Sequence, residues 1–335
     1  MCIRDRSLGT AEVVLKVTMP FVVYFFARSF IRTGDDLMGI VTAFVFSSIV
    51  PFSLLSYEMV FEPLGMDVSR GMERLEGLYA DAVSYAIYST QAFLCLLYLF
   101  LARTRYSRKN LGSASRDIII GFVMCLLCLL AIKHAASWAV VAALLVLVIF
   151  SSGQRGGLVL ICGLSIMVAA SYFTMGDRIK EDTATLYKTD LAVMSGDMKI
   201  ERGLHGRVSI WKKLASYWVE FPLIAKLFGS PMSMDTKARY MLLGSVHNDY
   251  LRMTFLTGLF GLLLYCSFFA SSFFSSFRAD NPERFLIRGM LMVYGMYSLT
   301  IMPSLYAPCI YLGMSIFAYS ALVEEVTCSR RLGKW

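Results

Sequence analysis

The sequence has little charge and very little histidine. Only 17% of its 335 residues are Asp, Glu, Lys or Arg, and only three are histidine. It is 57% hydrophobic with a mean hydropathy of +0.61, whereas soluble domains average about 45–50% apolar residues. This composition excludes an ordinary soluble domain and indicates a membrane protein.

Several motifs with well-defined chemistry are also missing. The chain has no phosphate-cradling glycine-rich loop, no HExxH and no GxSxG. None of its eight cysteines falls in the two long hydrophilic segments, residues 58–82 and 175–249, so no disulfide framework is implied. Cys125 and Cys128 form a CxxC inside an apolar run, which is more typical of small lipid-compatible side chains than of redox chemistry.

Long apolar runs predict an all-α polytopic membrane protein. A helix needs about 20 residues to cross roughly 30 Å of hydrocarbon. The runs are continuous, whereas the strands of a membrane barrel would alternate apolar and polar residues. We expect about nine transmembrane helices, at residues 12–30, 37–57, 83–101, 117–133, 136–151, 156–174, 250–277, 286–302 and 304–321.

The spans and the hydrophilic segments divide the chain into five parts. We interpret residues 1–11 as a fragment edge or a non-native start, because they match no signal peptide and place arginines on the predicted external side. Residues 12–174 are predicted to form a six-span bundle with an external loop at 58–82. The remaining parts are a large external loop, a three-span bundle and a cytoplasmic tail, at 175–249, 250–322 and 323–335.

Basic residues set this predicted orientation. Lys and Arg collect in residues 103–116, in residues 278–288 and in the C-terminal tail, and segments of this kind stay in the cytoplasm. The formal net charge of +8 is therefore attributed to membrane orientation and not to nucleic-acid binding.

Residues 206–228, in the large loop, predict an amphipathic helix that Pro222 limits. Because Trp and Tyr favour the membrane interface, we expect this helix to lie on the outer leaflet. An ordinary loop helix packed on the bundle is an equally good interpretation. The helical spacing is carried by Trp211, Leu214, Ala215 and Trp218.

Three residues on the predicted external side have side chains suited to phosphate and proton chemistry: Arg74, Arg207 and His247. An arginine binds phosphate through paired hydrogen bonds, and a histidine exchanges a proton near neutral pH. Each also has an ordinary role, because such an arginine is often solvated and a histidine can cap a helix. A metal site at His247 and Asp249 would need a third ligand, and the spacing to His205 fits no known motif, so we expect no metal.

Four stretches resemble the O-antigen polymerase/ligase family of bacterial envelopes. "RLEGLYADAVSYA" (74–86) is similar to its Arg-x-x-Gly segment, and "SSGQRGGLVLI" (151–161) to its Ser-x-x-Arg-Gly stretch. More specific are "GRVSIWKKLASYWVEFPLIAKLFGS" (206–230), which resembles its Arg-x-x-x-Trp helix, and "HNDYLRMTFLTGLFGLLLY" (247–265), which resembles its His-Asn-x-Tyr-Leu element. The family's Pro-Asn after the first stretch is "ADAV" here.

The resemblance implies a metal-independent glycosyltransferase without a cofactor, in the bacterial inner membrane, with its active site on the periplasmic face. The donor would be a polyprenyl-diphosphate-linked oligosaccharide. The acceptor would be a glycan in a polymerase, which we favour, or lipid A core in a ligase of lipopolysaccharide synthesis. Membrane lipid is a further partner. Arg74 and Arg207 would hold the diphosphate, and His247 would activate the acceptor hydroxyl. The residues implied to support substrate binding are Asn248, Tyr250 and Trp211.

Two other functions remain open on the sequence. A transporter or flippase of lipid-linked glycan would share the spans, the external arginines and the interfacial helix, but it would carry more charged residues deep in its spans. A structural membrane partner would tolerate replacement of His247 and Arg207.

Overall fold

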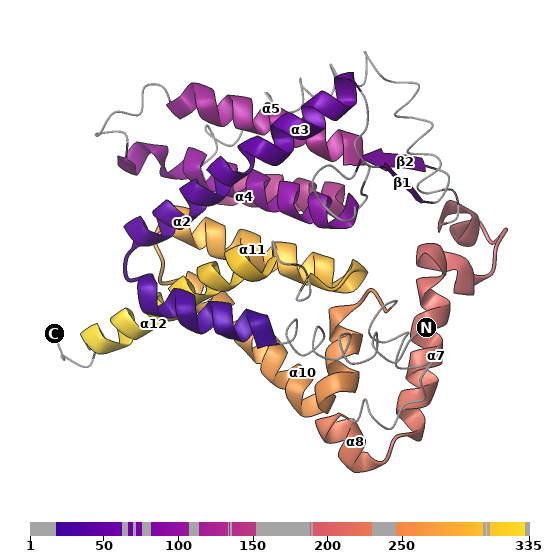
Figure 1. Ribbon diagram of the computed structural model, residues 1–335. Coiled ribbons are helices and arrows are strands. Elements are labelled where there is room, and N and C mark those ends of the chain that lie inside the picture. The colour runs from indigo at the N-terminus through magenta and orange to yellow at the C-terminus, as the bar shows by residue number, and fades with distance from the viewer. Residues whose placement is uncertain are drawn as a thin grey trace, which may run out of the picture.

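The structure is a computed structural model in which the chain forms a bundle of helices with one small sheet (Figure 1). It describes residues 18–61, 66–69, 72–75, 82–106, 114–132, 134, 136–151, 188, 190–229, 246–303, 306 and 309–331.

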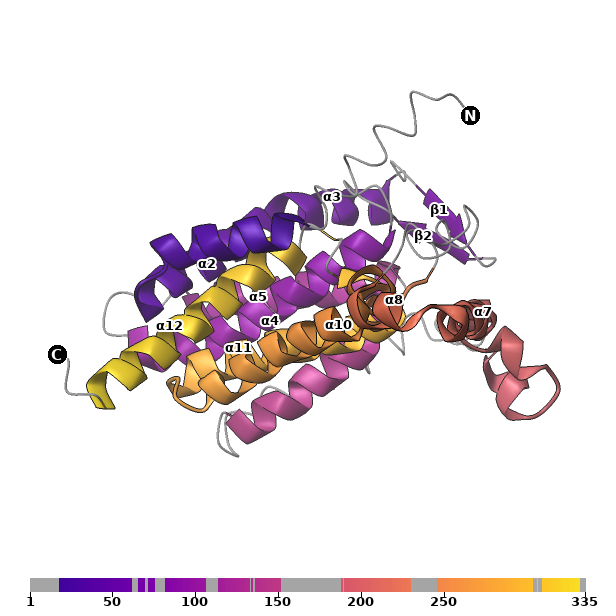
Figure 2. The ribbon, with the colours of Figure 1, turned by 90° about the horizontal axis from the view of Figure 1, so that it is seen from below.

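The bundle helices run side by side along one direction, as both ribbon views show (Figures 1 and 2). They are a helix over residues 18–30, α2 (Gly34–Ser47), α3 (Ile49–Val60), α4 (Ala82–Tyr106), α5 (Ala114–Ile132), a helix over residues 136–151, α10 (Asp249–Ser276), α11 (Asn281–Thr300), and α12 (Met314–Arg331), which follows the π-helix η6 (Cys309–Gly313).

The other elements gather at one end of the bundle, opposite the C-terminal end of α12 (Figures 1 and 2). We call this the α7 end. Its elements are the 3-10 helix η2 (Ile200–Gly206), α7 (Arg207–Glu220), α8 (Leu223–Phe228), and the antiparallel strands β1 (Met66–Ser69) and β2 (Met72–Leu75).

The helical fold class predicted from the sequence is confirmed, with one addition. The hairpin of β1 and β2, in which Met66 pairs with Leu75, lies in the segment predicted to be a plain loop. Each strand has four residues, which is the shortest run over which alternating polarity indicates a strand, and the second strand, MERL, does not alternate.

Four helices of the described part are long and apolar enough to cross a membrane: Gly34–Glu58, Ala82–Ala102, Asp249–Ser276 and Cys309–Thr327. They match four of the nine expected spans. The expected spans at 117–133, 136–151 and 286–302 also fall on helices. The one at 156–174 lies outside the described residues, as does the start of the first, so the count of nine stays a prediction.

The centre of the bundle is formed by α4 and α11. In α4, 83% of the most apolar window is buried, compared with 11% in α10. Phe285, Ile287 and Tyr297 of α11 are fully buried. These two helices therefore carry the core, while one side of α10 is left for lipid.

Basic residues cluster at the C-terminal end of the bundle. Arg28 pairs with Glu325 of α12, and Arg278 pairs with Glu324 at 3.2 Å. Arg284 donates to the carbonyl of Ala279 at 3.1 Å in the connection between α10 and α11. These basic residues lie at the end of the bundle opposite the hairpin and α7. The positive-inside rule associates an excess of Lys and Arg with the cytoplasmic side.

Candidate functional site

The stretch "HNDYL" forms the start of α10. The side chain of Asn248 caps this helix, because its Oδ1 accepts the backbone N–H of Leu251 at 3.0 Å. The preceding residue, His247, has a φ of 45° and is the non-glycine residue with positive φ in the described part of the chain. A side chain in this backbone region is unusual and persists where neighbours hold it, often at functional sites.

Trp211 holds this stretch against α7. Its Nε1–H donates to the carbonyl of Val246 at 2.8 Å. Leu214 of α7, Val246, Phe255 of α10 and Met302 form a small buried cluster beside the bond. Trp211, which the sequence predicts to support substrate binding, therefore makes a structural contact with the residue before His247.

Arg207 lies on the same side of α7 as Trp211. It is the first residue of the helix and precedes Trp211 by four positions, or about one turn and 6 Å of rise. Because Trp211 bonds to Val246, the residue next to His247, α7 and the start of α10 meet at this contact.

A charged pair on the surface ties η2 to α7. Lys212 donates to Oε1 of Glu201 at 3.1 Å. The backbone N–H of Glu201 and the Lys212 ammonium hold the pKa of the Glu201 carboxyl below its ordinary value. Both groups are exposed to solvent, so this pair orients η2 more than it stabilises the fold.

Arg74, the third predicted catalytic residue, lies on β2, where it pairs in register with Asp67. The hairpin is at the α7 end of the bundle, the same end as Arg207 (Figure 2). The Arg74 side chain is outside what the structure describes, so a contact with the other two predicted residues stays a prediction.

A buried ion pair, which sequence analysis missed, lies beside the candidate residues. Asp249 and Arg252 are 0% and 1% exposed, and Oδ1 of Asp249 receives both Nε and Nη2 of Arg252 at 2.9 Å. Opposite charges three positions apart at a helix start are the signal that predicts such a contact. The pattern does not predict burial, which comes from packing against the rest of the bundle.

Tyr250 faces the bundle. Its ring meets the ring of Tyr265 edge-on at 6.2 Å. Its hydroxyl lies so near α11 that a Cβ on Gly295 would be 3.9 Å from it. Of the three residues predicted to support substrate binding, Tyr250 therefore packs inward, while Asn248 and Trp211 bond to backbone.

α10 is broken at Gly258, which has a φ of 70° and a ψ of −172°. Figure 1 shows that the orange ribbon of α10 turns sharply. The predicted span at 250–277 matches a candidate membrane helix, and the structure adds a break within it at Gly258. The straight part, residues 259–276, is about 27 Å long and reaches nearly across the hydrocarbon layer. The first part carries the candidate site.

The break in α10 meets the end of α8 through two glycines. A Cβ on Gly258 would lie 2.2 Å from the Leu227 carbonyl oxygen, and a Cβ on Gly229 would lie 2.4 Å from the Leu256 oxygen. Both glycines have positive φ. Backbone therefore packs directly on backbone here, and we call this contact the glycine joint.

The predicted interfacial helix at 206–228 is two helices in the structure. α7 ends at Glu220, two residues before Pro222, and packs on α10, so the interpretation as a loop helix on the bundle holds for α7. α8 exposes its apolar side, with Leu223 71% and Ile224 75% exposed. This face is the one suited to lipid.

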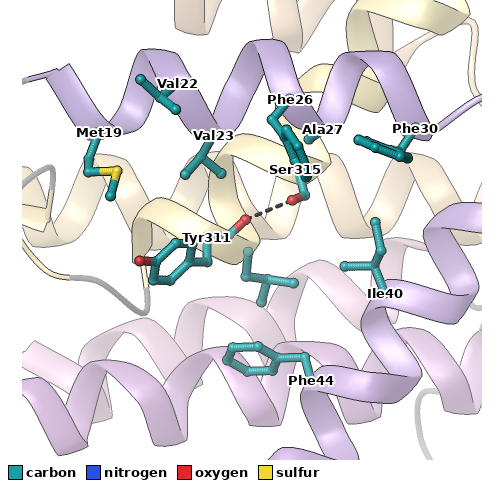
Figure 3. A pocket seen from close by; sticks show the side chains of 11 residues that line it. Met19, Val22, Val23, Phe26, Ala27, Phe30, Ile40, Phe44, Tyr311 and Ser315 are labelled. Atoms are coloured by element: carbon teal, nitrogen blue, oxygen red, sulfur yellow. Dashed lines mark hydrogen bonds between the residues drawn. The ribbon is translucent and has the colours of Figure 1, made fainter.

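An apolar cavity of about 530 Å³ lies between the helix over residues 18–30, α2 and the start of α12 (Figure 3). Phe26, Phe30 and Phe44 line it. The bond drawn in Figure 3 joins the Ser315 hydroxyl to the Tyr311 carbonyl, so that hydroxyl is already engaged. This lining holds no carboxylate, histidine, lysine or arginine.

Within the described ranges, no group of three His, Cys, Asp or Glu side chains is placed to hold a metal ion. The His205 side chain lies outside those ranges.

The fold and the site define the chain as a helical membrane protein with polar and basic groups at the α7 end. In comparisons with known proteins, no family model and no curated protein matches the chain.

Proposed function

We propose that the chain is a membrane glycosyltransferase of the O-antigen polymerase/ligase type, with polymerase favoured over ligase. It transfers glycan from a polyprenyl-diphosphate-linked donor to a sugar hydroxyl. The observation that carries the proposal is the bond from Trp211 to Val246, at 2.8 Å. This bond joins the stretch at 206–230 to the residue directly before the stretch at 247–265. These two stretches have the most specific family resemblance, and they hold Arg207 and His247.

In the proposed reaction, the acceptor oxygen attacks the anomeric carbon of the donor. The bond from that carbon to the diphosphate oxygen breaks, and the diphosphate leaves with the bonding electrons. Arg207 and Arg74 stabilise the growing negative charge, a contribution worth on the order of 10²–10³ in rate for one group. His247 accepts the proton of the acceptor hydroxyl, which typically contributes about 10²–10⁴. No metal or cofactor takes part in this scheme.

The exposed face of α8 supports a lipid-linked donor. Phe228 of α8 lies against Phe260 of α10, with ring centroids 6.1 Å apart, and both rings are more than half exposed. The apolar face of α8 thus continues onto the lipid side of α10. A donor held in the membrane would meet the site at this boundary. The basic C-terminal end supports an inner-membrane orientation with the site on the periplasmic side.

The test uses purified protein in detergent with lipid-linked oligosaccharide from a bacterial envelope. Release of polyprenyl diphosphate and glycan length are followed by mass spectrometry. We expect longer glycans from a polymerase, or transfer to another acceptor from a ligase, and loss of both in Arg207→Ala and His247→Ala. Lys213→Ala is the matched control, because Lys213 is an exposed cation on the same helix. Full activity in Arg207→Ala would refute the diphosphate role, and strong inhibition by a chelator would refute metal independence.

A transporter or flippase of lipid-linked glycan is the second candidate, and two observations favour it. α10 is broken within a candidate span, and a charged pair is buried beside the break. Transporters bind their substrates at broken helices and carry ionisable groups in their spans. In proteoliposomes a flippase would move labelled donor between leaflets without release of diphosphate, whereas the proposed enzyme releases diphosphate in detergent.

A further inference from the structure

Two arginines near the start of α11, Arg284 and Arg288, lie against the end of α10. Nε of Arg288 donates to the Ser276 hydroxyl oxygen at 3.1 Å. Nη2 of Arg284 donates to the carbonyl of Ala279 at 3.1 Å and to that of Phe277 at 3.4 Å. These bonds fix both guanidinium groups at the connection between the two helices, at the end of the bundle opposite α7.

The second of these arginines lies over aromatic rings. The guanidinium carbon of Arg288 is 4.3 Å from the ring centroid of Phe277 and 5.6 Å from that of Phe273. A cation in this position is attracted by the face of the ring. Phe277 is 53% exposed and Phe273 is 42% exposed, and Phe274 between them is 64% exposed. The guanidinium is therefore held at the edge of the exposed apolar side of α10.

The depth of this edge in a membrane follows from α10. The straight part of the helix, residues 259–276, is about 27 Å long and reaches nearly across the hydrocarbon layer. Phe273 and Phe277 lie at its end, so they are close to the boundary where hydrocarbon gives way to the polar headgroups. Arg288 lies over these two rings and is therefore at the same boundary.

Within the described part of the chain, no carboxylate neutralises the two arginines. The nearest carboxylates along the chain, Asp280 and Glu283, pair with neither of them. Glu283 is buried on the side towards α2, where a Cβ on Gly34 would lie 3.4 Å from its Oε1. Because Arg284 and Arg288 are four positions apart on one helix, their charges repel each other, and a bound anion would offset this repulsion.

Both guanidinium groups also keep N–H donors for a ligand. A guanidinium has five N–H donors, and in the described contacts Arg288 uses Nε while Arg284 uses Nη2. Nε of Arg284 is buried and has no hydrogen-bond partner in the described ranges. The donors on Nη1 and Nη2 of Arg288 and on Nη1 of Arg284 are left for an acceptor with several oxygens, such as a phosphate group.

The neighbouring rings decide between a lipid and other sources of an anion. A free phosphate would use the two arginines and leave the exposed rings of Phe273 and Phe277 without a role. A phospholipid uses both features, because its phosphate lies at the headgroup level and its acyl chains lie in the hydrocarbon layer. Basic pockets between membrane helices bind anionic headgroups of this kind in other proteins.

We propose that Arg284, Arg288, Phe273 and Phe277 form a binding site for an anionic phospholipid, in the leaflet at the C-terminal end of the bundle. The phosphate accepts hydrogen bonds from the Nη groups of both arginines. An acyl chain lies on the two rings and along the exposed side of α10. This site is at the opposite end from His247, and it does not rest on the proposed glycosyl transfer.

The first test is native mass spectrometry of the full chain in detergent, titrated with phosphatidylglycerol or with zwitterionic phosphatidylcholine. We expect phosphatidylglycerol to bind more tightly to the wild-type chain. Arg284→Gln and Arg288→Gln should each weaken this binding by about fivefold, because a basic residue near an anionic lipid surface contributes about 1 kcal/mol. Equal binding of the two lipids to the wild-type chain, or wild-type binding in Arg288→Gln, would overturn the proposal.

Arg32→Gln is the matched control for charge. Arg32 is an exposed arginine at the same end of the bundle, between the helix over residues 18–30 and α2. Its removal should leave phosphatidylglycerol binding unchanged. A loss as large as in Arg288→Gln would mean that the lipid responds to total charge and not to this site, which contradicts the proposal.

A second variant separates lost binding from lost folding. Arg288→Lys keeps the charge but not the planar fork of donors. It should bind phosphatidylglycerol more tightly than Arg288→Gln does and less tightly than the wild-type chain. The unfolding temperature of each variant is compared in detergent without added lipid. If Arg288→Lys binds no better than Arg288→Gln and both unfold at the wild-type temperature, charge recognition by Arg288 is refuted.

Competition with inorganic phosphate tests the source of the anion. Because the acyl chain also contacts the protein, phosphatidylglycerol should stay bound when inorganic phosphate is added at the same concentration. Displacement by inorganic phosphate would make this a site for a free anion and would overturn the assignment to a lipid.

Phe277→Leu tests the rings. It keeps an apolar side chain but removes the ring nearest to the Arg288 guanidinium, so phosphatidylglycerol binding should weaken by about two- to fivefold. Phe274→Leu is the matched control, because Phe274 is an exposed ring on the same helix that has no cation over it among the described residues. Equal affinities in the two variants would remove Phe277 from the site.

Discussion

Replacing Gly258 by alanine should separate α8 from α10 at the glycine joint. The φ of 70° and ψ of −172° at Gly258 lie in a region essentially restricted to glycine, and placing another residue there costs about 1–3 kcal/mol. The new Cβ would also lie 2.2 Å from the Leu227 oxygen, and overpacking of this kind adds about 1–3 kcal/mol. We therefore expect the free energy of unfolding to fall by about 2–6 kcal/mol. That is a large part of the ~5–15 kcal/mol that holds a typical domain folded.

The assay is thermal unfolding of the purified variant in one detergent, beside a matched glycine variant. Gly39 on α2 has no atom within 4 Å of the place where a Cβ would lie. Gly39→Ala should therefore leave stability unchanged or raise it by about 0.5–1 kcal/mol, the usual gain for alanine over glycine within a helix. Gly229→Ala should resemble Gly258→Ala, because its Cβ would lie 2.4 Å from the Leu256 oxygen. If Gly258→Ala unfolds at the wild-type temperature, the glycine joint does not require glycine at this position.

Three further substitutions test the contacts around the site, each by the free energy of unfolding. Arg252→Leu should cost about 3–5 kcal/mol by leaving the Asp249 carboxylate buried without its cation, and the double variant Asp249→Leu/Arg252→Leu should recover most of this loss. If the double variant is less stable than Arg252→Leu alone, loss of the ion pair does not explain the destabilisation. Trp211→Phe keeps an aromatic ring but removes the donor to the Val246 carbonyl, so about 1–3 kcal/mol should be lost, together with glycan transfer if α7 positions the site. Thr33→Ala removes the side-chain cap of α2 and should cost about 1 kcal/mol with no change in transfer; a loss of transfer would show that this cap is coupled to the site.

The helices were largely predictable because their signals are local. A continuous apolar run of about 20 residues indicates a helix from local sequence alone. The runs at 37–57 and 83–101 fall on apolar helices, and the run at 304–321 overlaps the apolar helix at Cys309–Thr327. The end of α7 before Pro222 is predicted by the same kind of rule, since a proline rarely continues a helix. These features depend on residues within one or two turns of each other.

The features that shape the candidate site were not predictable in this way. Gly258 lies within an apolar run, and nothing local fixes the sign of its φ. Positive φ is required only because the end of α8 packs on it. The burial of Asp249 and Arg252 likewise follows from packing against the rest of the bundle.

Three separate contacts hold the short first part of α10, and together they explain how His247 keeps a positive φ. The indole of Trp211 holds the residue before it, the pair of Asp249 and Arg252 fixes the first turn after it, and the glycine joint holds the far end of the segment. A strained backbone persists only where its surroundings determine it from several directions. Loss of any one contact should therefore weaken the site without releasing it. Loss of the Trp211 contact should be felt most at His247, because that bond is to the adjacent residue.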